Sequence, residues 1–137
     1  MKVVICGDRD CDDIKVLQKA VKDANFEITE IVSGCAKGAD KLGEEYAKIH
    51  NIPVKKFPAD WKNLDVDGAV VKEGQYGKYN SRAGFMRDIE MVEYADAVLA
   101  LQPYGESAGT QITIREAKKR GLPTFVAGGV NVQEIAF

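Results

Sequence analysis

The sequence has few cysteines and histidines, and their spacing argues against disulfide and metal sites. Among its 137 residues, cysteine occurs only at Cys6, Cys11 and Cys35, and His50 is the single histidine. No CxxC pair occurs, and an odd number of thiols is not typical of a disulfide framework. We therefore expect reduced thiols in a cytoplasmic protein, with no metal site and no cofactor.

The sequence also lacks a long hydrophobic run and an excess of charge of either sign. No stretch approaches the roughly 18 apolar residues of a membrane span, and the first residues do not form a signal peptide. With 19 basic and 21 acidic residues, the formal net charge is -2. This balance gives no general attraction to nucleic acid, so we expect neither a membrane nor a nucleic-acid partner.

What the chain does contain is a regular alternation of short apolar runs and helical patterns. Strand-like runs lie at residues 3–6, 30–32, 53–57, 98–101 and 122–126, and helical spacing lies at 14–24, 39–50, 85–94 and 109–120. Alternation of this kind predicts βαβ units, a mostly parallel five-stranded sheet and a Rossmann-like three-layer α/β sandwich. The length fits a single domain over residues 1–137.

Residues 60–81 interrupt this alternation. The stretch is rich in glycine, aspartate, lysine and tyrosine and has weak periodicity. Loops of this length in compact domains are commonly lids or binding loops, and the alternative is a disordered insertion. Trp61 begins the insertion, so it either stacks on a ligand base at the mouth of a pocket or packs within the loop.

Glycine-bearing loops follow the first, second and fourth strands, where ligands bind in open parallel sheets. Two of them run directly into a helix, whose N-terminus offers unpaired amides and a positive dipole end for phosphate. The candidate ligand-binding residues in these loops are Gly7, Asp8, Arg9, Ser33, Gly34, Lys37, Gly38, Asp40, Ser107, Gly109 and Thr110.

The side chains of these loops suggest separate roles. Arg9 is expected to contact a phosphate or a base, because its planar fork donates in pairs, and Asp8 or Asp40 is expected to hold ribose hydroxyls. Arg87, near the start of a helix, also suits an anion. The alternatives are a surface turn at Asp8 and Arg9, ordinary helix capping by Asp40 and by Ser107, and an exposed surface arginine at position 87.

Taken together, these stretches resemble the YspA-like, YpsA-related family of the SLOG superfamily, which also includes the LOG phosphoribohydrolases (lysine decarboxylase-like proteins) and DprA. The matching stretches are residues 7–9, 32–40, 57–61, 76–80, 83–88 and 105–110. The resemblance implies the sheet order 3-2-1-4-5. It also implies binding of a nucleoside monophosphate, an ADP-ribose-like molecule or a signal derived from NAD, and related domains often form homo-oligomers.

Two departures from the family pattern bear on catalysis. Arg87 is followed by Asp88, where the family usually has asparagine, and Thr113 stands where the LOG motif carries its catalytic glutamate. The candidates for a substitute acid are Glu106, Asp8 and Glu116, with Glu106 best placed because it lies in the loop itself.

Three functions follow as expectations. The first is binding of a nucleotide-derived ligand through the glycine-rich loops, and the second is hydrolysis of the N-glycosidic bond of a nucleotide. The third is binding of single-stranded DNA, by analogy with DprA. The overall acidity argues against it, because the only basic run is at residues 118–120.

Overall fold

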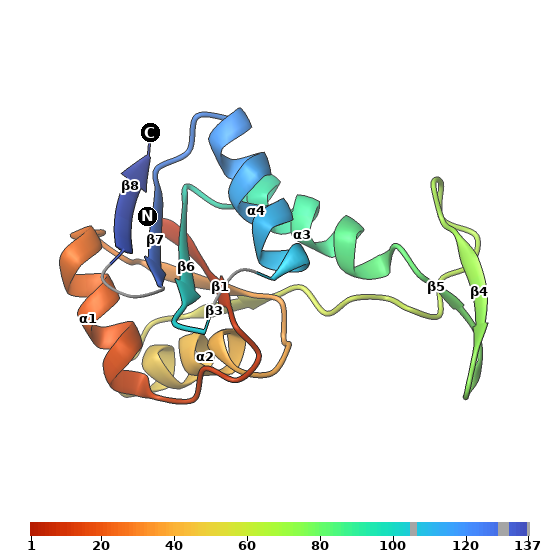
Figure 1. Ribbon diagram of the computed structural model, residues 1–137, viewed down its shortest axis with the longest axis horizontal. Coiled ribbons are helices and arrows are strands. Elements are labelled where there is room, and N and C mark those ends of the chain that lie inside the picture. Colours follow the sequence, from red (N-terminus) through yellow and green to blue (C-terminus); the bar gives the residue numbers. More distant parts are fainter. Residues whose placement is uncertain (105–106, 129–131, 137) are drawn as a thin grey trace.

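The protein has a central parallel sheet with helices on both faces (Figure 1). In the computed structural model, which describes residues 1–104, 107–128 and 132–136, five parallel strands lie in the order β3-β2-β1-β6-β7. Their bounds are β1 (Lys2–Gly7), β2 (Glu30–Ser33), β3 (Val54–Lys56), β6 (Ala97–Gln102) and β7 (Thr124–Gly128). The predicted Rossmann-like α/β fold and the strand order 3-2-1-4-5 are therefore confirmed.

A sixth strand, β8 (Val132–Ala136), pairs antiparallel with β7 at the sheet edge. The sequence analysis did not predict it. An antiparallel edge strand on a parallel sheet needs only a hairpin from its neighbour and no crossover helix. The alternation of strands and helices that predicted the other five strands therefore carries no signal for this one.

The two faces of the sheet follow from the alternation of side chains along each strand. Val3 and Ile5 pack with α1 (Ile14–Ala24) and α2 (Ala39–Ile49). Val4 and Cys6, one residue out of phase, pack with α3 (Ala83–Tyr94) and α4 (Ala108–Lys119). All four residues are buried, as expected for a central strand that is covered on both sides.

Each helix that the sequence predicts is present, and α1 and α4 begin at a side-chain cap. The Asp13 side chain accepts a hydrogen bond from the Lys15 amide and begins α1, and Asn25 ends it in the left-handed conformation. Ser107 caps the start of α4. None of the helices in the described part of the chain is long and apolar enough to cross a membrane.

The insertion at residues 60–81 contains an antiparallel hairpin of β4 (Val71–Gly74) and β5 (Gly77–Asn80). Figure 1 shows the hairpin extending away from the central sheet. Its base is held by Asn80, which is buried; the Asn80 amide donates to the Trp61 carbonyl, and its side-chain oxygen accepts from the amides of Val70 and Arg82. The described insertion is therefore an ordered hairpin.

Close packing of α2 on β1 depends on a glycine in the middle of the helix. A Cβ atom at Gly43 would lie 2.8 Å from the Cβ atom of Ile5. We expect Gly43→Ala to lower the free energy of unfolding by about 1–2 kcal/mol, because overpacking outweighs the roughly 1 kcal/mol that alanine gains in a helix. Urea denaturation measures the change.

Gly109→Ala in α4 is the matched control, because no described atom outside its chain neighbours and its own helix backbone lies within 4 Å of the added Cβ. It should leave stability unchanged or raise it slightly. Equal stabilisation by the two substitutions would contradict the packing argument.

Candidate functional site

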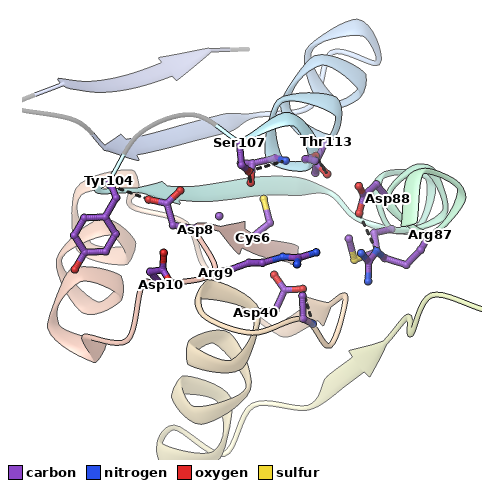
Figure 2. Close-up of a pocket in the computed structure, with 15 residues that line it drawn as sticks. Cys6, Asp8, Arg9, Asp10, Asp40, Arg87, Asp88, Tyr104, Ser107 and Thr113 are labelled. Atoms are coloured by element: carbon purple, nitrogen blue, oxygen red, sulfur yellow. Dashed lines mark hydrogen bonds and ion pairs between the residues drawn. The ribbon is translucent and has the colours of Figure 1, made fainter. Parts of the chain in front are cut away.

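A cavity of about 460 Å³ opens at the carboxyl ends of β1 and β6 (Figure 2). It lies between the β1–α1 loop on one side and the start of α4 with the inner face of α3 on the other. The residues that line it are Cys6, Gly7, Asp8, Arg9, Asp10, Ala36, Asp40, Arg87, Asp88, Met91, Tyr104, Ser107, Gly109, Thr110 and Thr113. This is the edge at which the sequence analysis placed the ligand.

The β1–α1 loop is held against β6 by main-chain contacts. Gly7 has a φ of 145°, and a Cβ atom there would overlap the carbonyl group of Leu101, so no other residue fits without a shift of the strands. The Asp8 amide donates to the Leu101 carbonyl at 2.8 Å, and its carboxylate accepts from the Tyr104 amide, also at 2.8 Å. Among the described residues, no donor bonds to the other carboxylate oxygen of Asp8, which lines the cavity.

The N-terminus of α4 forms the opposite wall. The Ser107 hydroxyl accepts from the Thr110 amide at 3.3 Å and lies 2.7 Å from the Thr110 hydroxyl. In the described part of the chain, no residue accepts from the amides of Ala108 and Gly109. These amides, together with the positive end of the helix dipole, are available to an anion.

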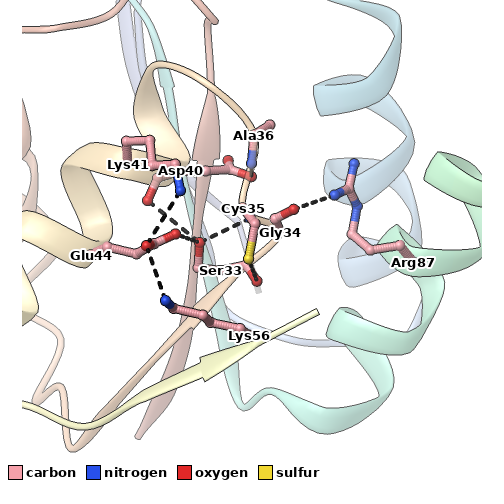
Figure 3. Close-up of polar contacts among 9 residues, drawn as sticks. All are labelled: Ser33, Gly34, Cys35, Ala36, Asp40, Lys41, Glu44, Lys56 and Arg87. Atoms are coloured by element: carbon pink, nitrogen blue, oxygen red, sulfur yellow. Dashed lines mark hydrogen bonds and ion pairs between the residues drawn. The ribbon is translucent and has the colours of Figure 1, made fainter. Parts of the chain in front are cut away.

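The N-terminus of α2 is closed by the protein itself. The Ala39 amide donates to the Asp8 carbonyl at 3.0 Å, and Gly38, with a φ of 77°, packs directly against the backbone of residues 8–9. The Asp40 carboxylate accepts from the Ala36 amide at 3.1 Å (Figure 3). An internal carboxylate thus occupies one of the loop amides that the sequence analysis offered to a phosphate.

Ser33 is fully buried and does not line the cavity. Its hydroxyl donates to the Glu44 carboxylate at 2.7 Å and accepts from the Cys35 amide at 3.1 Å. Glu44 in turn pairs with Lys41 and Lys56 at 3.6 and 3.7 Å (Figure 3). The Ser33 side chain therefore holds the β2–α2 loop in place and has no free donor for a ligand.

Arg87 projects from α3 across the cavity wall to the β2–α2 loop. Its guanidinium donates to the Gly34 carbonyl and to the Asp88 carboxylate, the latter at 2.9 Å. Arg9 is exposed, and Figure 2 shows its guanidinium pointing into the cavity. Two guanidinium groups thus face the same space, one held by protein contacts and one without an ion pair or hydrogen bond to the described residues.

Carboxyl groups outnumber these cations. Asp8, Asp10, Asp40 and Asp88 all line the cavity, and all but Asp10 are buried. Burial raises the pKa of Asp88 from 3.8 to about 6, against the lowering effect of Arg87, and burial also raises the pKa of Asp40. The cavity can therefore take up a proton near pH 6.

Neither a metal ion nor a reactive thiol is supported here. Among the described residues, no three histidine, cysteine, aspartate or glutamate side chains are arranged to hold a metal ion. Cys6 points into the cavity floor, but burial, with Asp40 and Asp88 nearby, raises the pKa of its thiol well above its ordinary value. The neutral thiol is a weak nucleophile.

Five of the predicted ligand-binding residues lie outside the cavity: Ser33, Gly34, Lys37, Gly38 and Trp61. Lys37 is exposed, and Gly34 and Gly38 shape the loop backbone. Trp61, expected at the mouth of the pocket, instead lines a groove on the hairpin. No described residue of the 60–81 insertion lines the cavity, so the insertion does not cover it as a lid in this structure.

The candidate acids are placed differently from one another. Asp8 lines the cavity, whereas Glu116 pairs with Arg120 at 3.7 Å near the end of α4. Glu106 lies outside the described residues. Thr113 is buried on the cavity wall, and its hydroxyl donates to the Gly109 carbonyl at 3.4 Å within the helix.

The sequence analysis missed several cavity residues. Asp10, Met91 and Tyr104 carry no motif, and Asp88 and Thr113 were noted only as departures from a family pattern. Met91 follows Arg87 by one helical turn, so the spacing i, i+4 could have placed both on the same face of α3. Tyr104 reaches the cavity only because β6 ends beside Asp8.

Comparison with known proteins gives three similarities. The family model described as YspA, cpYpsA-related SLOG family matches residues 1–64. The Gene 61 protein of Mycobacterium phage D29 is 30% identical over 135 residues, which cover 93% of this chain and 96% of that protein. The structure of DNA processing protein A (DprA) from Streptococcus pneumoniae has a similar fold, with a TM-score of 0.64 and 21% identity. The match covers 96% of this chain but only 51% of DprA, so the chain spans about half the length of that protein.

The raised pKa of Asp88 predicts a pH-dependent stability. The folded chain holds the Asp88 proton more tightly than the unfolded chain does. The contribution of this carboxyl to the free energy of unfolding is therefore favourable at low pH and is lost as pH rises from about 4 to about 6. We expect Asp88→Asn to be more stable than the wild type at pH 8, by on the order of 1–3 kcal/mol, and equally stable at pH 4. Denaturant titrations across this range measure the difference.

Asp12→Asn is the control, since Asp12 is exposed and does not line the cavity. Its stability difference from the wild type should not vary between pH 4 and pH 8. If the stability difference between Asp88→Asn and the wild type is also the same at pH 4 and pH 8, the Asp88 carboxyl does not titrate as described.

Proposed function

Because the chain belongs to the YspA, cpYpsA-related SLOG family, we propose that its cavity binds a nucleotide or a nucleotide-derived small molecule. The observation that carries the proposal is the open N-terminus of α4, which faces the same cavity as Arg9 and Arg87. Unpaired amides, a helix dipole and two guanidinium groups together form a site for one phosphate group. The candidate ligands are a nucleoside monophosphate, ADP-ribose or a signal derived from NAD.

The phosphate would lie against the first turn of α4. There the Gly109 amide and the Thr110 hydroxyl are the available donors, because the Ser107 hydroxyl already donates to Thr110. Gly109 helps because no side chain stands between its backbone and the ligand. The β2–α2 loop is a poorer phosphate site, because the Ala36 amide already donates to the Asp40 carboxylate and the Cys35 amide to the Ser33 hydroxyl.

The ribose would lie on the acidic side of the cavity. Asp8 bonds to the Tyr104 amide through one carboxylate oxygen, and no other described residue donates to the second; Asp10 beside it is exposed. Carboxylates accept well from a pair of sugar hydroxyls but repel phosphate. A ligand with one anionic end and one hydroxyl-rich part therefore fits better than a plain phosphate ion.

The dimensions and charge of the cavity favour a small molecule over a polymer. A volume of about 460 Å³ is within the range of small-molecule sites, about 300–1,000 Å³. Four carboxyl groups against two arginines would repel the successive phosphates of a nucleic-acid strand. The cavity itself is therefore proposed as a nucleotide site and not as a DNA site.

Cleavage of the N-glycosidic bond is the second candidate function. It is favoured by Asp88, a buried carboxyl on the cavity wall whose pKa of about 6 suits proton transfer to a departing base. Asp88 lines the same cavity as Thr113, the position at which LOG-like relatives carry their glutamate. Such cleavage needs a carboxyl near the anomeric carbon.

Binding is tested by thermal denaturation with adenosine monophosphate, ADP-ribose and inorganic phosphate. A ligand at 100 times its dissociation constant adds about 2.7 kcal/mol and raises the midpoint by several degrees. We expect a nucleotide to raise the denaturation midpoint. Arg9→Ala should lower the affinity for that nucleotide by about 10- to 100-fold, because a charge-assisted hydrogen bond to phosphate is lost. Arg9 is the better position to change, because Arg87 also supports the β2–α2 loop.

Arg115→Ala is the matched control, since Arg115 is an exposed arginine of α4 that does not line the cavity. It should leave the nucleotide shift unchanged. The proposal is wrong if no nucleotide raises the midpoint, or if Arg115→Ala weakens binding as much as Arg9→Ala.

Catalysis is tested separately, by incubating the protein with adenosine monophosphate and measuring free adenine by chromatography. We expect the nucleotide to stay intact, because Thr113 provides no carboxyl at the LOG position. Cleavage of the N-glycosidic bond would be established instead if the wild type released adenine and Asp88→Asn released it about 100-fold or more slowly while still binding the nucleotide.

A further inference from the structure

Tyr104 is the only aromatic residue among the described residues that line the cavity. It is 70% exposed, and its side chain forms no hydrogen bond, ring contact or cation–π contact with another described residue. Packing within the described part of the chain therefore does not account for an aromatic ring at this position.

The backbone that carries this ring is held on both sides of the residue's amide. Pro103 directly precedes Tyr104, and its own ring restricts its backbone φ. The Tyr104 amide donates to the Asp8 carboxylate at 2.8 Å, and the Asp8 amide donates to the Leu101 carbonyl near the end of β6. A tyrosine side chain has few torsions, so a ring on such a backbone loses little conformational entropy when a ligand covers it.

The cavity has an aromatic end and a cationic end. Figure 2 shows Tyr104 at one end and Arg87 with Asp88 at the other, and the guanidinium of Arg9 points toward the Arg87 end. Asp8 lies beside Tyr104, as the hydrogen bond between its carboxylate and the Tyr104 amide requires. A ligand that extends through the cavity therefore meets a carboxylate between the arginines and the ring.

This order matches the order of the parts of a nucleotide. In the proposed function the phosphate lies against the start of α4, near Arg9, and the ribose hydroxyls lie against Asp8. The base and the phosphate-bearing carbon are attached to the ribose on either side of its ring oxygen, so they extend in different directions. With the hydroxyls on Asp8 and the phosphate toward Arg9, the base extends to the side on which Tyr104 lies.

We infer that the ring of Tyr104 stacks on the base of the bound nucleotide, so that the cavity selects ligands that carry a base over sugar phosphates that lack one. The inference rests on the proposed nucleotide site and specifies its ligand class. Stacking covers one flat face of the ring and one of the base, and it adds affinity without distinguishing strongly among bases.

The opposite end of the cavity offers a base no aromatic face. Its wall there includes Met91, Thr113 and two buried carboxyl groups, Asp40 and Asp88. A base on Tyr104 lies at the other end from Asp88 (Figure 2), so that carboxyl does not reach it to protonate it. Stacking on Tyr104 thus favours binding of an intact nucleotide over cleavage of its N-glycosidic bond.

The test compares adenosine monophosphate with ribose 5-phosphate, which has the same sugar and phosphate but no base, by calorimetric titration. We expect Tyr104→Ser to lower the affinity for adenosine monophosphate about 5- to 100-fold, because the stacking contact is lost. The affinity for ribose 5-phosphate should stay within about twofold of the wild type, since the Tyr104 amide still bonds to Asp8. Tyr104→Phe keeps the ring and should bind both ligands as the wild type does.

Tyr76→Ser is the matched control. Tyr76 is also an exposed tyrosine, 86% accessible, but it lies at the tip of the hairpin and does not line the cavity. The substitution should change neither dissociation constant. The denaturation midpoint of Tyr104→Ser without ligand should match that of the wild type, because the side chain has no hydrogen bond or ring contact with described residues.

Four results would overturn the inference, and they separate it from the proposed function. If adenosine monophosphate binds the wild type and Tyr104→Ser equally, the nucleotide site stands but its base does not stack on this ring. An equal loss for both ligands would mean that Tyr104 supports the sugar phosphate and not the base. A loss in Asp88→Asn for adenosine monophosphate alone, with none in Tyr104→Ser, would place the base at the opposite end. If neither ligand binds the wild type, the proposed function fails and the inference fails with it.

Discussion

The backbone at Gly7 and Asp8 joins the parts of the molecule on which the cavity depends. Gly7 brings the end of β1 into contact with the Leu101 carbonyl of β6, and the Asp8 amide bonds to that same carbonyl. The Asp8 carbonyl then accepts the first amide of α2, and its carboxylate fixes the Tyr104 amide after β6. One dipeptide therefore sets the separation of two strands, the start of a helix and one wall of the cavity.

This arrangement gives the two helix N-termini opposite roles. At α2 the protein satisfies its own amides, through the Asp8 carbonyl and the Asp40 carboxylate, so the positive end of the helix dipole stabilises the loop. At α4 the described residues leave the first amides without an acceptor, and Arg9 and Arg87 face the same space. Buried Asp40 and Asp88 limit the positive charge of the site. We propose a ligand that carries one phosphate and several hydroxyls, which is consistent with this balance.

The hairpin has a different chemistry from the cavity. The cavity is lined by carboxyl groups and arginines close to the core, whereas the groove on the hairpin is lined by aromatic rings and Lys62. An isolated two-stranded hairpin is marginally stable in water, and here buried Asn80 ties its base to the start of α3. The insertion is thus held in place without altering the sheet that forms the cavity.

The sequence by itself determined the five parallel strands and the four helices, because each βαβ unit combines a short apolar run with a periodic helix. The order of the strands followed from the resemblance to the SLOG superfamily. It also located the cavity edge, since ligands bind where parallel strands end, and eight of the predicted ligand-binding residues line the cavity: Gly7, Asp8, Arg9, Asp40, Arg87, Ser107, Gly109 and Thr110. Only the tertiary structure decided which loop amides lack an acceptor among the described residues. It also decided that Ser33 is bonded to Glu44 and that Trp61 lines the groove on the hairpin. Those outcomes depend on contacts between residues far apart in the chain, such as Arg87 with Gly34, and local sequence patterns do not encode them.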